Sequence, residues 1–448
     1  MKGFKRLSLL MALVLMMGAL AGCGGSKDVT NTSQETTENT QGDSSSTSDA
    51  NKVIEITMLN SKGEIQAQLE EAAKAFSEDN PNIKLDIIVA EVGQSPFEKI
   101  SVMYAAGNAP ALAMLDPVDI PNLADKFLDL SNEKWVSDAV NNSLDNVTLD
   151  GKVMGFPLSV EGSGFIYNKT ILDQAGVDPT AIKTTKDLEE AFKKVKAAGF
   201  EALAISPMDW SLGAHFLPIA YSTQSSDSEE VNRFLNELKA GNIDLKTNKA
   251  FNGLMDTFDM MKQYNMYKND PLAATYESNQ QAMGSGEVGF WFMGNWTWPQ
   301  IYEFAQVTEG FGFIPVPISN NPDDYGNSGI PVGMGKYIGI DKENNNEEQQ
   351  AAAKKFLEWL VYSEKGQDFF VNKANLIPAF KNITLEPQDP LAKSIKEYMT
   401  NGKTIQVIST LPADHWAEVG ASMQKYLVDM IDRDTLIEEI QAYWKNVK

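Results

Sequence analysis

Apolar and polar stretches alternate along the chain and predict alternating strands and helices. Residues 53–59 predict a strand, and apolar side chains at helical spacing over 65–76 predict the helix that follows. A proline flanked by asparagines at 80–82 ends this helix, and 83–89 predict a second strand. A β–α–β start of this kind favours a parallel sheet with ligand loops at the carboxyl ends of its strands.

Polar residues follow the predicted strands. Asn60, Ser61 and Lys62 come directly after the first strand, and Asp116 follows a short apolar strand at 111–115. Because the carboxyl ends of parallel strands meet at one edge of a sheet, these residues are candidates for a common binding site. Taken singly, each is also an ordinary choice for a turn.

A second candidate region begins with the apolar run 288–293, which predicts a short buried strand. Gly294 and Asn295 end the run, and the pattern places Trp296 and Trp298 in a loop or in the first turn of a helix. Indole faces at the end of a buried strand suit a flat ligand with apolar faces and polar edges, such as a pyranose ring. The alternative is that these tryptophans simply cover a core.

The N-terminus has the pattern of a bacterial export signal. Positive residues precede the apolar stretch 7–20, which is too short to span a bilayer comfortably. The sequence Leu-Ala-Gly-Cys at 20–23 resembles the bacterial lipobox, and this resemblance implies cleavage before Cys23 and a lipid on its thiol. We therefore expect residues 1–22 to be a signal peptide, with a chance cysteine after an ordinary signal as the alternative. Cys23 is the only cysteine, which excludes disulfides and cysteine-based zinc sites.

The segment behind this cysteine differs in composition from the rest of the chain. Up to residue 52 it is mostly Ser, Thr, Asn, Gln, Asp and Glu, so it cannot bury enough apolar surface to fold. We expect 23–52 to be a lipidated, flexible tether. Residues 53–448 are too many for one usual core and predict two domains. The formal net charge of −23 argues against nucleic acid or an anionic surface as partner.

Several short stretches occur in an order and spacing that point to one family. They are AAGNAP at 105–110, GFP at 155–157 leading to IYNK at 166–169, the aromatic stretch 289–298, GFIPVP at 312–317, and the predicted helical regions 352–372 and 418–444. Together they resemble the extracellular solute-binding proteins of sugar ABC transporters, the family of maltose-binding protein. The resemblance spans nearly all of 53–448 and rests on the order of the stretches rather than on any single one.

The resemblance implies an α/β, periplasmic-binding-protein-like fold of two lobes with a hinge and a ligand cleft between them. It implies three crossings, near 158–162, 313–317 and 372–377. Lobe 1 is then expected to comprise 53–160 plus 316–372, and lobe 2 to comprise 161–315 plus 373–448. The glycines that flank Glu161 would let the first crossing bend.

The resemblance also implies a set of ligand-binding residues. Aromatic residues would stack on sugar rings, and polar residues would bond sugar hydroxyls, a role that suits ionised carboxylates. The candidates are Trp296, Trp416, Trp210, Trp298, Glu161, Asp116, Lys62, Ser61, Asn60 and Gly333.

The function that the resemblance implies is a lipid-anchored receptor on the extracytoplasmic face of the cell membrane. It would capture an oligosaccharide as a monomer, without metal or organic cofactor, and deliver it to the permease subunits of an ABC importer. One alternative is the same fold binding a peptide or a polyamine. Others are a secreted glycoside hydrolase that uses Asp116 and Glu161 as its carboxylate pair, or a lipid-anchored adhesin. No nucleophile elbow, phosphate loop or metal-ligand spacing favours an enzyme.

Overall fold

The structure is a computed structural model that describes residues 52–90 and 95–447. The predicted signal peptide, the predicted lipidation site Cys23 and the predicted tether up to residue 51 lie outside the described residues. Within the described ranges, no helix combines the length and apolar character that crossing a membrane requires.

Strands and helices alternate along the described chain, with most helices in its middle and C-terminal parts. The strands are β1 (Ile54–Asn60), β2 (Ile83–Val89), β3 (Leu112–Leu115), β4 (Thr148–Leu149), β5 (Lys152–Val153), β6 (Phe156–Asn168), β7 (Glu201–Ala204), β8 (Val288–Gly294), β9 (Phe311–Ile314), β10 (Ile330–Ile340), β11 (Ile377–Pro378) and β12 (Thr404–Gln406). The α-helices are α1 (Gln66–Asp79), α2 (Pro96–Ala105), α3 (Lys169–Gln174), α4 (Thr185–Ala197), α5 (Pro218–Ser222), α6 (Ser228–Lys239), α7 (Lys249–Tyr264), α8 (Tyr276–Ser285), α9 (Trp298–Ala305), α10 (Tyr325–Ser328), α11 (Glu347–Tyr362), α12 (Glu364–Asp368), α13 (Pro390–Thr400), α14 (His415–Leu427) and α15 (Arg433–Asn446).

Shorter helical turns complete the description. They are the 3-10 turns η1 (Gly63–Ile65), η2 (Pro121–Lys126), η3 (Lys134–Asp138), η4 (Asp145–Val147), η5 (Pro179–Ala181), η7 (Pro271–Ala273) and η8 (Asn295–Thr297), and the π-helical turns η6 (Ser211–Phe216) and η9 (Phe369–Lys373).

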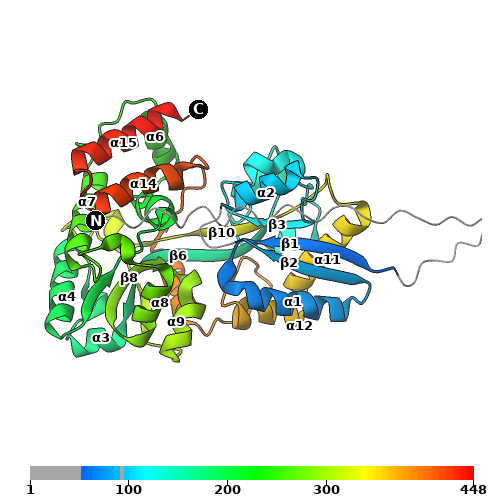
Figure 1. Ribbon diagram of the computed structural model, residues 1–448, viewed down its shortest axis with the longest axis horizontal. Helices are drawn as coiled ribbons and strands as arrows, with labels where there is room; N and C mark the ends of the chain where they lie inside the picture. The colour runs from blue at the N-terminus through cyan, green and yellow to red at the C-terminus, as the bar shows by residue number, and fades with distance from the viewer. Residues whose placement is uncertain (1–51, 91–94, 448) are drawn as a thin grey trace, which may run out of the picture. The chain divides into compact units, whose positions relative to one another are not determined.

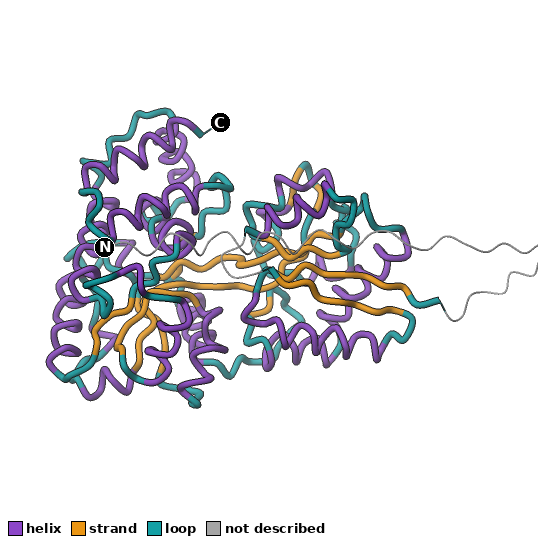
Figure 2. Tube along the Cα trace, viewed as in Figure 1, coloured by secondary structure: helices purple, strands orange, loops and turns teal. Residues whose placement is uncertain are grey.

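The main sheet has ten strands, with the order β2-β1-β3-β10-β6-β8-β7 along its path. Strands β9 and β11 pair with β6, and β12 pairs with β10. Strands β1 and β2 are parallel and in register from Ile54 opposite Ile83, which confirms the predicted β–α–β start. Helices lie on both sides of the sheet region formed by β1 and β2 (Figure 2).

Two long strands join the two halves of the sheet. The first part of β6, up to Gly162, pairs with β10, whereas its second part, from Ser163, pairs with β8 and β9. Strand β10 likewise pairs with β12 at its start and with β3 at its end. We call the half built on β1–β3 with α1, α2, α11 and α12 the first lobe, and the half built on β7–β9 with α3–α9 and α13–α15 the second lobe (Figure 1).

Each lobe has its own core. Phe76, Trp135 and Phe356 belong to a buried cluster of the first lobe, and Phe192 and Phe258 belong to one of the second lobe. The helical stripes that contain these two second-lobe phenylalanines are buried as their apolar spacing predicts.

Two of the three expected crossings need correction. Phe313 lies in β9 of the second lobe, and Val316 is still buried in the second-lobe core, so β10 makes the crossing that was expected at 313–317. Phe380 and Ile383 are still buried in the first-lobe core, which moves the third crossing beyond the expected 372–377. A short apolar stretch predicts a strand. The lobe to which the strand belongs depends on the strand with which it pairs, and the local sequence does not predict that partner.

Candidate functional site

A cavity of about 850 Å³ opens between side chains of both lobes and of the two joining strands. The first lobe contributes the loops after β1 and β3, and the second lobe contributes the turns near η6, η8 and α14. The loops after β1 and β3 and the turn η8 after β8 lie at the carboxyl ends of their strands, where ligand sites of α/β sheets are usual.

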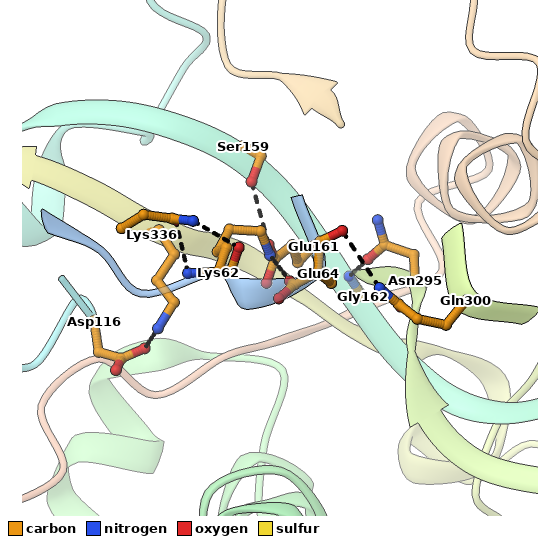
Figure 3. A network of polar contacts seen from close by, with 10 residues as sticks. Lys62, Glu64, Asp116, Ser159, Glu161, Gly162, Asn295, Gln300 and Lys336 are labelled. Carbon is orange, nitrogen blue, oxygen red and sulfur yellow. Dashed lines mark hydrogen bonds and ion pairs between the residues drawn. The ribbon is translucent and has the colours of Figure 1, made fainter. Parts of the chain in front are cut away.

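A buried lysine organises the first-lobe side of the cavity. The side chain of Lys62 is only 3% exposed, and its Nζ lies 2.7 Å from Oε1 of Glu64 and 2.7 Å from Oε1 of Glu161 (Figure 3). Burial by itself lowers the pKa of Lys62, but the attraction of Glu161 and then of Glu64 outweighs it, so its pKa lies above its ordinary value. Asn60 supports this turn, because its Oδ1 accepts the backbone N–H of Lys62 at 2.9 Å.

An irregularity in β10 places a second lysine. The pairing of β10 with β6 skips Gly335, so this residue bulges out of the register. A Cβ on Gly335 would lie 2.1 Å from the carboxyl carbon of Glu161, so only glycine allows that carboxylate its position. The next residue, Lys336, reaches across to Asp116 at the end of β3, with its Nζ 2.6 Å from Oδ1 (Figure 3).

Asp119 is the most buried carboxylate that lines the cavity. It is 4% exposed, and no side chain of the described residues donates a hydrogen bond to it. Burial, followed by the repulsion of Asp116, raises the pKa of Asp119 to about 7, and the charge of Lys336 and a hydrogen bond with the backbone of Asp116 oppose this rise only in part.

The second-lobe side of the cavity is aromatic. The ring centroids of His215 and Trp296 lie 4.7 Å apart, and Trp210 meets His215 edge to face at 5.9 Å. Tyr276 extends the group by an edge-to-face contact with Trp210 at 5.7 Å. A Cβ on Gly294 would overlap the Trp296 ring at 1.9 Å, so the indole lies directly on the backbone of β8. This packing holds the aromatic faces in place before any ligand arrives.

The histidine of this aromatic group carries no charge near neutral pH. Burial lowers the pKa of His215 to about 4, and the carboxylates of Glu161 and Asp116 oppose the shift only in part. A neutral imidazole has one donor and one acceptor nitrogen, which suits a ligand hydroxyl. His215 lies in the π-helical turn η6, which packs against the start of α14 and so places it close to the segment that carries Trp416.

The structure brings most of the predicted residues to this cavity. Those that line it are Ser61, Lys62, Asp116, Glu161, Trp210, Trp296, Gly333 and Trp416. Asn60 is fully buried behind the wall and supports Lys62 instead. Trp298 is a correction: it is 3% exposed and packs against Phe311 and Tyr302 in the core, because it begins α9 on the side that faces β9.

Further lining residues that sequence reasoning missed include Glu64, Asp119, His215, Tyr276 and Lys336. Two signals were available in the sequence. Glu64 and Asp119 follow the predicted strand-end residues within three positions. The other three depend on how distant segments meet. Within the described ranges no three His, Cys, Asp or Glu side chains gather in a way that would hold a metal ion.

Comparison with known proteins places this geometry in context. A family model described as bacterial extracellular solute-binding protein matches residues 71–445. The maltodextrin-binding protein of Bacillus subtilis is 25% identical over 424 residues, covering 91% of this chain and 85% of the relative. The multiple sugar-binding protein of Streptococcus mutans is 23% identical over 423 residues, covering 90% of each chain.

Solved structures share the fold. A solute-binding protein in complex with raffinose superposes with a TM-score of 0.74 at 20% identity, covering 88% of this chain and 99% of its own. A sugar transporter protein from Bacillus licheniformis in complex with stachyose gives 0.70 at 19% identity, covering 88% and 100%.

Proposed function

The chain belongs to the bacterial extracellular solute-binding proteins, and from this premise we propose that its cleft captures an oligosaccharide for an ABC importer. Relatives are named for the binding of maltodextrin, arabinooligosaccharides or multiple sugars, and two structural neighbours hold raffinose and stachyose. The single observation that carries the proposal for this chain is the pairing of an aromatic wall with a wall of charged side chains across one cavity.

This pairing matches the chemistry of a pyranose. Stacking on Trp296 or Trp210 removes the apolar C–H faces of the ring from water, and such burial is favourable. The ring hydroxyls extend sideways, where carboxylate oxygens of Glu161 and Asp116 accept their hydrogens as charge-assisted bonds. A few placed polar groups within an apolar lining are also the usual composition of a small-molecule site.

Binding calorimetry with a panel of oligosaccharides tests the proposal. We expect at least one to bind without release of monosaccharide and to raise the melting temperature. A ligand at a hundredfold excess over its Kd stabilises the folded state by about 2.7 kcal/mol. Binding of spermidine or peptides alone, or hydrolysis of the saccharide, would contradict it. We expect a chelator to leave the affinity unchanged.

Closure of the two lobes is the expected response to the ligand. We propose that β6 and β10 form the hinge, because β10 pairs with β3 of the first lobe, β6 pairs with β8 of the second lobe, and the two strands pair with each other. Small-angle scattering at saturation should give a smaller radius of gyration than the free protein. An identical radius would exclude closure but not binding.

We also propose that the receptor is monomeric, that it delivers its ligand to permease subunits, and that a lipid on Cys23 anchors it to the extracytoplasmic face of the membrane. The lipobox-like sequence at 20–23 and the polar tether behind it support the anchor. In cells, Cys23→Ser should move the protein from the membrane fraction to the medium or periplasm. Unchanged membrane retention would contradict the anchor.

A further inference from the structure

We propose that the cleft selects a glycan that carries a free, protonated amino group, such as a 2-amino-2-deoxy sugar, over neutral and acidic glycans. This inference rests on the proposed function and deepens it by naming the chemical class of the ligand. It follows from how the charges of the cavity are paired before any ligand is present.

The cavity holds more carboxylates than cations. Among the described residues that line it, the cationic side chains are Lys62 and Lys336, and the anionic ones are Glu64, Asp116, Asp119, Asp145 and Glu161. One lysine is shared by two carboxylates, and the other is bonded to Asp116. Neither lysine is therefore free to meet an acidic ligand, and the surplus of negative charge repels one.

Asp119 shows where a positive group would be stabilised. It is more than nine-tenths buried and lines the cavity, and the backbone of Asp116, but no side chain of the described residues, bonds its carboxylate. A buried carboxylate without a cationic partner is costly, as its pKa of about 7 reflects. An ammonium group next to it would supply the missing charge and three donors.

The aromatic wall requires that this ammonium belong to a ring. His215 is neutral and adds no cation, and the electrostatic influence of Glu161 and Asp116 on it shows that this wall lies within reach of the acidic one. A ring stacked on Trp296 would present its edge substituents toward those carboxylates. An amine on that edge is attracted by the carboxylates. A flexible polyamine has the charge but no ring face to cover the indole.

Three disaccharides with the same β-1,4 linkage isolate the effect of the amine. Cellobiose, the disaccharide of glucosamine, and N,N′-diacetylchitobiose differ only at C2, with hydroxyl, ammonium and acetamido groups. Calorimetry of the full-length protein at mildly acidic pH should give the glucosamine disaccharide at least tenfold tighter binding than the other two. The advantage should shrink as salt is added, because salt screens charge pairs.

A proton count gives a second readout on the unmodified protein. An ammonium bound beside Asp119 would lower the pKa of that carboxyl, so binding should release protons. The measured binding enthalpy should then depend on the ionisation enthalpy of the buffer for the glucosamine disaccharide and not for cellobiose.

Matched variants assign the effect to a residue. Asp119→Asn keeps the shape of the side chain and removes its charge, and should abolish most of the preference for the amine. Asp150→Asn removes a charge from an exposed residue that does not line the cavity and should leave the preference within about twofold. An equal loss in both variants would contradict the role of Asp119.

The outcomes separate this inference from the proposed function. Equal or tighter binding of cellobiose overturns the inference, and so does failure of all three disaccharides. In both of these outcomes, the proposed function stands if cellobiose or another neutral glycan binds. If no glycan binds on an array, both fail. The disaccharide series and the proton count need no variant, so they decide the inference even if Asp119→Asn does not fold.

Discussion

The two walls of the cleft are built on different physical principles. The first-lobe wall is held by ion pairs between separate elements, with Lys62 joining two carboxylates and Lys336 joining a third across the strand ends. The second-lobe wall has aromatic rings held by packing on one another and on the backbone of β8, as the contact of Trp296 with Gly294 shows. Ion pairs hold polar groups in fixed orientations, so their hydrogen bonds to a ligand are directional. Packed rings offer apolar faces, and contact with these faces depends little on the orientation of the ligand.

This difference assigns a role to each wall. Apolar burial against rings contributes affinity to any ligand with a flat C–H face, because it depends on area. Charged side chains in fixed positions discriminate between ligands, because a ligand whose polar groups do not match them leaves a buried charge unpaired. We therefore expect substitutions in the charged wall to alter stability and selectivity, and substitutions in the aromatic wall to alter affinity for all ligands.

The largest effect is expected from breaking the charged wall at its centre. Lys62→Met removes a buried lysine and leaves the partly buried Glu64 and Glu161 next to each other without their cation, and removing one partner of a buried ion pair costs about 3–5 kcal/mol. Urea unfolding should show a loss of this size in the ligand-free protein.

Lys336→Met is the matched control for this substitution. Its partner Asp116 is 40% exposed, so water can solvate the carboxylate that remains. The loss of stability should be clearly smaller than for Lys62→Met. Equal losses would show that the lysine at the centre of the charged wall has no special role.

The next largest effect concerns the aromatic wall. Burying about 80–120 Å² of apolar surface at about 25 cal/mol per Å² supplies about 2–3 kcal/mol. Trp296→Ala should therefore weaken oligosaccharide binding by about 30-fold or more, since 1.4 kcal/mol is a factor of ten. The melting temperature should change little, because the indole is partly exposed and lines the cavity.

Trp298→Ala is the control two residues away. This indole is in the core, where Trp→Ala typically costs about 3–5 kcal/mol of stability. It should lower the melting temperature and leave affinity unchanged in the folded fraction. If Trp296→Ala behaves in the same way, its predicted stacking role is wrong.

These two tryptophans also show how much of the structure can be predicted from the sequence. The bounds of β2 and the start of β8 follow from strong local patterns and were predicted to the residue. The same pattern treats Trp296 and Trp298 alike, although one lines the cavity and the other is covered by Phe311. Burial of a side chain after a strand depends on which distant segment packs there, and the local sequence does not state this.

The missed residues have the same explanation. Lys336 enters the cleft because Gly335 bulges from a pairing between β10 and β6, which are far apart in sequence. His215 is placed by a π-helical turn against α14, and no periodicity marks such a turn. Asp119 was within reach, because a second aspartate three positions after a strand-end aspartate is a visible signal.

A smaller effect is expected from the imidazole in the aromatic wall. His215→Ala should weaken binding by about tenfold, the size of one hydrogen bond plus some lost ring contact. Because the pKa of His215 is lowered to about 4, its folded form resists protonation that the unfolded chain accepts near 6.5. Wild-type stability should therefore fall as pH drops from about 6.5 toward 4, and less steeply in His215→Gln. Parallel pH profiles of unfolding would contradict this.

The smallest effect separates burial from ligand binding. Asp389 is the N-cap of α13 and is as buried as Asp119, but it does not line the cavity. Burial raises its pKa to about 7, although the backbone N–H groups of Ala392 and Leu391 oppose the rise. A carboxyl with a raised folded pKa binds protons that the unfolded chain has lost, so stability falls as pH rises from about 4 to 7. Asp389→Asn keeps a good helix cap and avoids the buried charge.

We expect Asp389→Asn to be more stable than the wild type by on the order of 1 kcal/mol at pH 8 and to match it near pH 4, where the wild-type carboxyl is protonated. Urea unfolding at both pH values measures the difference, and calorimetry should find unchanged ligand affinity. The gain in stability of Asp119→Asn over the wild type should depend on pH in the same way, because burial also raises the pKa of Asp119. Unlike Asp389→Asn, this variant should also lose the preference for the amino sugar. A gain in Asp389→Asn that is equal at both pH values would mean that packing, and not the buried charge, limits stability at this cap. If Asp119→Asn alters stability alone, the charged wall has no part in choosing the ligand, and the contrast between the two walls is structural only.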